Sequence, residues 1–223
     1  MPVALAYADA MKPLFLAVAL CAQFLSACAM VTGNGVAKTE ARDLANFSAI
    51  ELAGAIEAHV TFGEAFAVTV SGDENLVPLV RTTVAGGALQ VSTKGSYRTK
   101  LPLRVSIVMP ALSALEITGA ARAVVQNVHA EALKLEISGS GTLEMTGAAT
   151  SASLVVSGAG EVLGQGFTAT NADIAISGAG TVEITATTRL VAKVSGAGAV
   201  RYLGPVTDIV TTITGAGSVK RLK

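Results

Sequence analysis

Acidic side chains that could act as an acid and a base recur one repeat apart in this sequence. Glu116 and Glu136 hold equivalent positions in two consecutive copies of a repeat of about 19 residues. A second row of charged residues consists of Glu144, Glu183, Arg201 and Lys220. Paired carboxylates are the groups that cleave glycosidic bonds, so Glu116 and Glu136 are the best candidates for catalysis. A solvated face produces such rows as well, and no histidine base or aromatic surface accompanies them, so we expect no enzymatic activity.

Other kinds of site fit the residue types poorly. The glycine-rich corners of the repeat have neither the lysine nor the strand-to-helix context of a phosphate-binding loop, and they have no aspartate for calcium. His59 and His129 are the only histidines and lie far apart in the sequence, which argues against zinc. The corner serines have no histidine or lysine at matching positions to activate them. We therefore expect no catalytic residues, no metal and no cofactor.

The corners themselves are the strongest signal in the chain. They read Thr118-Gly-Ala-Ala, Ser138-Gly139-Ser-Gly, Ser157-Gly158-Ala-Gly160, Ser177-Gly178-Ala-Gly180, Ser195-Gly196-Ala-Gly198 and Thr214-Gly215-Ala-Gly217. Their spacing of 18 to 20 residues is typical of a solenoid, whose coils must stack to bury a continuous core. We expect glycine to supply positive φ at each corner and the Ser/Thr hydroxyls to bond turn amides along a ladder.

Alternating apolar and polar residues flank every corner. The residue before the corner is always apolar: Ile117, Ile137, Val156, Ile176, Val194 and Ile213. This alternation predicts half-buried strands, and long helical periodicity is missing between the glycines. Successive coils run in the same direction, so equivalent strands should pair in parallel with a right-handed connection. The sequence predicts an all-β fold, a right-handed parallel β-helix with about 19 residues per coil.

The N-terminus has the features of an export signal. Lys12 precedes an apolar run from Leu14 to Leu25 that is too short to span a bilayer. We assign residues 1–27 to a signal peptide, with Met11 as the better start. Leu25-Ser-Ala-Cys28 resembles the bacterial lipobox, so we expect Cys28 to be the first mature residue and to carry lipid; the alternative is an ordinary signal peptide followed by an unrelated cysteine. Ala29 in the second mature position favours the outer membrane.

The mature chain divides into three parts. Residues 28–39 are expected to be the lipidated cysteine and a short flexible tether, residues 40–110 an N-terminal β segment that starts and caps the stack, and residues 111–223 the β-helix with its six corners. One or two helical turns are expected between Glu74 and Val84, with Asp73 as the cap. Lys220, Arg221 and Lys223 place charge on the last coil, where it would discourage pairing of the edge with another chain.

Composition excludes some partners and leaves others open. The chain has 16 basic and 16 acidic residues, no tryptophan and only 4% aromatic residues, which argues against nucleic acid. Cys28 is the only cysteine left after cleavage, so no intramolecular disulfide is expected. The expected partners are a membrane, through lipid on Cys28, and a protein or glycan that the sequence does not identify.

The sequence from about Arg42 to Val219 resembles a bacterial family described as the putative auto-transporter adhesin, head GIN domain. The resembling elements are Phe47-Ser-Ala-Ile50, Gly72-Asp-Glu-Asn75, Gly87-Ala-Leu-Gln-Val91, the run from Pro110 to Gly119 and the serial Ser-Gly-Ala-Gly corners. The resemblance implies an exported, often lipid-anchored β-helical protein.

Two functions of different classes follow from these features. The first is a non-enzymatic envelope lipoprotein, in the outer membrane, that presents a rigid β-helix as a binding or adhesion surface. The second is a polysaccharide-acting enzyme of β-helical shape. Periplasmic sensing or envelope maintenance is a third possibility that the sequence does not separate from the first.

Overall fold

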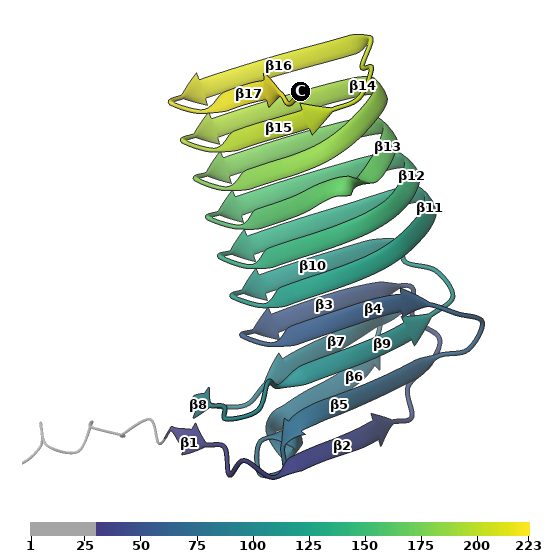
Figure 1. Ribbon diagram of the computed structural model, residues 1–223, viewed down its shortest axis with the longest axis vertical. Coiled ribbons are helices and arrows are strands. Elements are labelled where there is room, and N and C mark those ends of the chain that lie inside the picture. The colour runs from purple at the N-terminus through teal and green to yellow at the C-terminus, as the bar shows by residue number, and fades with distance from the viewer. Residues whose placement is uncertain (1–29) are drawn as a thin grey trace, which may run out of the picture.

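Stacked coils of β-strand make up almost the whole of this protein. The computed structural model describes residues 30–223. Fifteen strands form one continuous sheet that wraps around a core, and β1 (Val31–Thr32) and β8 (Tyr97–Arg98) form a separate two-stranded sheet. Figure 1 shows the coils as a column, with the N-terminal strands at one end and the C-terminal strands at the other. The all-β, parallel solenoid predicted from the sequence is confirmed.

The repeats correspond to long strands that each run from one corner to the next. These are β11 (Arg122–Gly139), β12 (Thr142–Gly158), β13 (Glu161–Gly178) and β14 (Thr181–Gly196), preceded by the shorter β10 (Ala114–Gly119). The last coil consists of β15 (Ala199–Leu203), β16 (Asp208–Gly215) and β17 (Ser218–Arg221). Each long strand bends where its pairing register shifts, as between Val125 and Val128 in β11. One strand therefore covers two sides of the coil.

The pairing register follows the sequence repeat residue for residue. The corner serine or threonine of each coil pairs with that of the next, from Thr118 and Ser138 to Ser195 and Thr214. The apolar residue before each corner lies in the core, and Ile117, Ile137, Val156, Ile176 and Val194 are almost completely buried. Ile213 holds the same position in the last coil but is 44% exposed, because no further coil covers it.

The stack begins earlier than the six corners indicate. β3 (Ala49–Gly54) pairs in parallel with β10, and β4 (Glu57–Phe62) pairs with β11, although more than fifty residues separate them in the chain. Gly54 pairs with Gly119 and turns the chain with φ +98°, so it is a further corner. This corner does not match the motif of the others, because Ala53 stands where they have serine or threonine.

Residues between these coils fold back to form the N-terminal end of the stack. On one side β7 (Ala88–Thr93) pairs in parallel with β3, and β6 (Val80–Ala85) then pairs antiparallel with β7. On the other side β9 (Arg104–Met109) pairs in parallel with β4, followed by β5 (Ala67–Asp73) and β2 (Ala37–Arg42), both antiparallel. Antiparallel strands thus replace the parallel coils at this end.

Two local expectations for this region are wrong. Part of the predicted flexible tether is ordered, since Val31–Thr32 and Ala37–Arg42 are strands. Asp73 does not cap a helix, because only a single 3₁₀ turn forms at Val77–Leu79 and its N-cap is Leu76 without a side-chain bond. The buried Asp73 carboxylate instead accepts hydrogen bonds from the backbone N–H groups of Gly35, Lys100 and Leu101. It fastens the first residues of the described chain to the domain.

The predicted signal peptide and Cys28 lie outside the described residues. Within residues 30–223, no helix is long and apolar enough to cross a membrane.

Candidate functional site

The corners are held by backbone hydrogen bonds between coils. The residue after the first glycine donates its N–H to the carbonyl of the equivalent glycine one coil earlier: Ala159 to Gly139, Ala179 to Gly158 and Ala197 to Gly178, each at 2.8 Å. The expectation that Ser/Thr hydroxyls bond these amides is wrong. Among the described residues, the hydroxyls of Ser138, Ser157, Ser177, Ser195 and Thr214 make no hydrogen bond, and these side chains are exposed. They form a row on the outside of the molecule.

The two glycines of a corner are required for different reasons. Gly178 has φ +123°, and a Cβ there would lie 2.5 Å from the carbonyl oxygen of Gly158 in the preceding coil. Gly180 is pressed against the core, since a Cβ would lie 2.5 Å from Cγ1 of Val156. The same contacts recur at the other corners, so Gly139, Gly158, Gly196 and Gly215 share the role of Gly178, and Gly160, Gly198 and Gly217 share that of Gly180. The glycines of the predicted corners are therefore structural.

The molecule presents two outer faces, one on each side of the corners. The post-corner face consists of the outward side chains of β4 and β9, of the strand segments that follow each corner, and of β15 and β17. The pre-corner face consists of the outward side chains of β3, β10 and β16 and of the segments of β11–β14 that lead into each corner.

Charges on the post-corner face are paired between neighbouring coils. Glu57 accepts hydrogen bonds from Arg104 and lies 2.7 Å from Nε2 of His59. The contact with His59, helped by Arg104, holds the pKa of Glu57 below its ordinary value despite partial burial. Arg122 likewise pairs with Glu144. Exposed pairs of this kind contribute little to stability.

Glu183 is the most enclosed carboxylate of this face. It accepts hydrogen bonds from Arg201 at 2.9 Å and from Gln165 at 2.6 Å. Arg201 first and then Gln165 lower the pKa of Glu183, and these bonds outweigh the opposing effect of burial. The row predicted from the sequence is confirmed in part, because Glu183, Arg201 and Lys220 are in register while Leu163 separates Glu144 from Glu183. Both of its glutamates are paired with an arginine, Glu183 with Arg201 and Glu144 with Arg122.

On the pre-corner face, carboxylates of neighbouring coils lie next to one another. Glu116 pairs in register with Glu136, as the sequence predicted, and Glu51 continues the row in the preceding coil. Glu51 was missed because its coil lacks the Ser/Thr corner. Each carboxylate has a polar neighbour: Glu51 accepts a hydrogen bond from Gln90, Glu116 one from Thr118, and Glu136 pairs with Lys134. Glu116 is exposed and Glu51 and Glu136 are partly exposed, and none of the main pockets in residues 30–223 combines these carboxylates with aromatic side chains.

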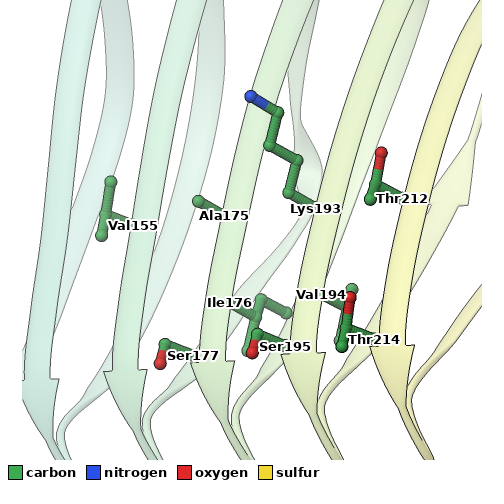
Figure 2. Close-up of a pocket in the computed structure, with 9 residues that line it drawn as sticks. All are labelled: Val155, Ala175, Ile176, Ser177, Lys193, Val194, Ser195, Thr212 and Thr214. Atoms are coloured by element: carbon green, nitrogen blue, oxygen red, sulfur yellow. The ribbon is translucent and has the colours of Figure 1, made fainter.

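The pre-corner face changes character farther along the stack, where a shallow hollow replaces the carboxylates. The hollow has a volume of about 270 Å³ and is lined by Val155, Ala175, Ile176, Ser177, Lys193, Val194, Ser195, Thr212 and Thr214. Figure 2 shows two parallel rows along successive strands, Val155, Ala175, Lys193 and Thr212 in one and Ser177, Ser195 and Thr214 in the other. Small side chains, one ammonium group and a row of hydroxyls thus form an open, nearly flat surface.

The histidines of the described residues lie apart from one another and outside any cluster of metal-binding side chains. No group of three or more metal-binding side chains occurs among residues 30–223. His59 lies beside Glu57, whereas Nδ1 of His129 contacts the carbonyl oxygen of Asn127, so the structure does not bring the two histidines together. What the surface can do chemically is bind, through apolar contact, hydrogen bonds to hydroxyls and the charge of Lys193.

A family model matches residues 46–205, which include the strands from β3 to β15. The family is described as "Putative auto-transporter adhesin, head GIN domain". The chain belongs to this family. Membership in the GIN domain family supports a binding or adhesion role and a place at the cell surface or in the cell envelope.

Solved structures share the fold of this GIN domain. A putative adhesin from Bacteroides fragilis is similar over 86% of this chain and 100% of its own, with a TM-score of 0.71 and 19% identity. Two proteins from Parabacteroides distasonis, a putative lipid binding protein and a putative adhesin, each match 87% of this chain and 100% of their own, with TM-scores of 0.52 and 23% identity. A comparison with curated proteins found no significant match.

Proposed function

We propose that the protein is a non-enzymatic, lipid-anchored envelope protein that presents the pre-corner face of its β-helix to a protein or glycan. The observation that carries this proposal is the hollow around Ala175 together with the outward hydroxyl row. Coil stacking does not use the hydroxyls of Ser177, Ser195 and Thr214, because the corners are held by backbone hydrogen bonds. A rigid, flat and largely uncharged surface suits binding better than bond cleavage, which needs groups converging on one reacting atom.

The proposed location rests on the sequence before Met30. Leu25-Ser-Ala-Cys28 follows a short apolar run, and lipid on Cys28 would hold the domain at a membrane, with the outer membrane favoured by Ala29. The family supports an envelope location in general.

Replacing the proposed lipid attachment site tests the anchor. The Cys28→Ala variant should leave the membrane fraction and appear in the soluble envelope fraction, because it has no thiol to carry the lipid. Fractionation with intact mass measurement of the parent and the variant reads the result. A variant that sediments with membranes at the mass of the parent chain would overturn the anchor.

A second candidate function is cleavage of a polysaccharide by the glutamate row. The specific observation is the register of Glu51, Glu116 and Glu136, since parallel strands about 4.8 Å apart place carboxylates at a separation close to that of retaining glycosidases. Each of these carboxylates is exposed or partly exposed and engages its own neighbour on the surface. The proposal therefore favours binding, and cleavage of a polysaccharide by the parent protein would favour the enzyme.

A further inference from the structure

The N-terminal end of the stack combines exposed apolar and basic side chains. Met30, Val31 and Val36 are 57%, 38% and 53% exposed, respectively. Val31 and Gly33 donate their N–H groups to the carbonyls of Ser96 and Arg98, which places β1 directly against β8. Figure 1 shows β1, β8 and β2 together at the end opposite β16 and β17.

The segment that follows β7 and pairs with these first residues is basic. Arg98 pairs in register with Thr32, and Lys100 lies beside Gly35. Both are exposed, as is Lys94, and neither Lys94 nor Arg98 forms an ion pair with another residue of the described chain. Glu74 is exposed and donates its backbone N–H to the carbonyl of Val36, and the buried Asp73 carboxylate interacts with the charge of Lys100. Lys94 and Arg98 are therefore the unpaired positive charges of this segment, and they favour an anionic partner.

The first described residues are held against the domain by hydrogen bonds and do not form a flexible linker. The Asp73 carboxylate binds the N–H of Gly35 at 2.6 Å, and Asn75 bonds both the N–H of Asn34 and the carbonyl of Thr32. Only Ala29 separates Cys28 from Met30. At about 3.5 Å per extended residue, Cys28 cannot lie more than roughly 7 Å from Met30.

We infer that this end of the stack is a membrane-seating surface that rests on an anionic bilayer. The inference rests on the proposed lipid at Cys28, because the short link to Met30 then brings the end face to the lipid headgroups. Met30, Val31 and Val36 enter the interface, and Arg98 and Lys100 contact phosphate groups, as exposed apolar and basic side chains do at membrane surfaces. The lipid holds the protein, and this surface sets its orientation.

Orientation decides where the binding surface is presented. Nine strands from β6 to β16 stack at about 4.8 Å, so β16 in the last coil lies about 38 Å beyond β6 at the N-terminal end. A protein seated on its N-terminal end holds its hollow and its hydroxyl row away from the membrane, where a partner can reach them.

Amine footprinting on vesicles tests whether the membrane-seating surface contacts the bilayer. The full lipidated chain is added to preformed phosphatidylethanolamine and phosphatidylglycerol vesicles and labelled with a membrane-impermeant amine reagent. Relative to the soluble Cys28→Ser chain, labelling of Lys94 and Lys100 should fall roughly five-fold or more, while the exposed Lys193 and Lys220 keep their rates. Equal rates at Lys100 and Lys193, or protection of Lys193, would overturn the inference.

Two matched variants distinguish the contribution of the membrane-seating surface from that of the lipid on Cys28. Met30→Ser/Val31→Ser/Val36→Ser should stay on the vesicles but regain labelling at Lys100. Ile209→Ser/Val210→Ser/Ile213→Ser, which changes the exposed apolar residues of the opposite end, should leave Lys100 protected. Unchanged protection in the first variant would contradict the seat.

Flotation and intact mass of the parent report the lipid independently of the footprint. If Cys28 proves unmodified, the anchor proposal fails. Coupling a maleimide phospholipid to Cys28 then allows the same footprint to test the seat by itself.

Discussion

Single residues in this protein act mainly through how closely they allow two coils to approach. The corner motif Ser-Gly-Ala-Gly resembles a binding loop, yet each of its glycines has a steric explanation. Gly178 needs positive φ and lies against a backbone carbonyl, whereas Gly180 lies against a core side chain. The serine alone has no structural partner among the described residues, and this leaves its hydroxyl available on the surface.

Gly178→Val tests the corner at this scale. A Cβ 2.5 Å from the Gly158 carbonyl oxygen, at φ +123°, should lower the free energy of unfolding by about 1 to 3 kcal/mol. Ala179→Val is the matched control, because Ala179 is the exposed neighbour in the same turn, and its effect should be near zero. Denaturant unfolding of both variants measures the difference. Equal losses would contradict the stacked-corner account.

Asp73→Asn tests the anchor point of the N-terminal end. Burial alone would raise the pKa of Asp73, but hydrogen bonds from the N–H groups of Leu101, Lys100 and Gly35 lower it below its ordinary value of 3.8. A carboxyl whose pKa is lower in the folded state stabilises above its unfolded pKa, and this contribution is lost as pH falls through the folded pKa. The variant should be less stable than the parent at neutral pH, and the difference should shrink as the pH falls below 3.8.

Melting temperatures across this pH range measure the Asp73 effect. Asp173→Asn serves as control, since Asp173 is exposed and makes no hydrogen bond with the described residues. A difference in melting temperature between the parent and Asp73→Asn that stays constant to low pH would show that the carboxylate charge does not cause the loss of stability.

Elements of the stack differ in how many neighbours cover them. β12 and β13 pair along both edges, whereas β16 pairs only with β14 and all eight of its residues are exposed. In a solenoid each coil is stabilised chiefly by its neighbours, so the terminal coil is the least stable. The open end also exposes Ile209 and Ile213, whereas the residues at the same positions in the inner coils are buried.

Amide hydrogen exchange should therefore be fastest in β16 and β17 and slowest in β12 and β13. Mass spectrometry of peptic fragments gives the comparison, repeated after dilution to detect any self-association through the open end. Protection of β16 equal to that of β13 in the dilute protein would contradict this gradient of stability.

The sequence predicted the repeating coils better than the ends of the stack. Period, strand direction and the inward column could be predicted because stacking requires the same small or apolar residue at the same position in every coil. The path of the chain from β4 through β9 to β10 could not be predicted from the sequence. The pairing between β3 and β10 joins segments that are far apart in the chain. Asp73 was assigned as a helix cap because its neighbours have a local turn pattern, whereas its partners Gly35 and Lys100 are distant in sequence. The glutamate pair was predicted from the repeat, while the hollow depends on small side chains that carry no motif.

The described chain is a column of coils with antiparallel strands at its N-terminal end, an open C-terminal end and two outer faces of different chemistry. On the post-corner face, Arg122 pairs with Glu144 and Arg201 pairs with Glu183 of the neighbouring coil. The pre-corner face leads from a glutamate row to a hollow that no other part of the described chain fills. Its role in binding, rather than in catalysis, is the central claim.

Retention of coated beads on a panel of polysaccharides and matrix proteins tests that claim most directly. The mature chain is coupled to beads through Cys28, and release of reducing ends from each polysaccharide is measured in parallel. Ala175→Arg fills the hollow, while Ala199→Arg places the same side chain on the post-corner face. We predict that the parent and Ala199→Arg bind at least one panel member, that Ala175→Arg lowers retention roughly ten-fold, and that no reducing ends appear. Equal loss of retention in both variants, or cleavage by the parent that disappears in Glu116→Gln/Glu136→Gln, would contradict the account.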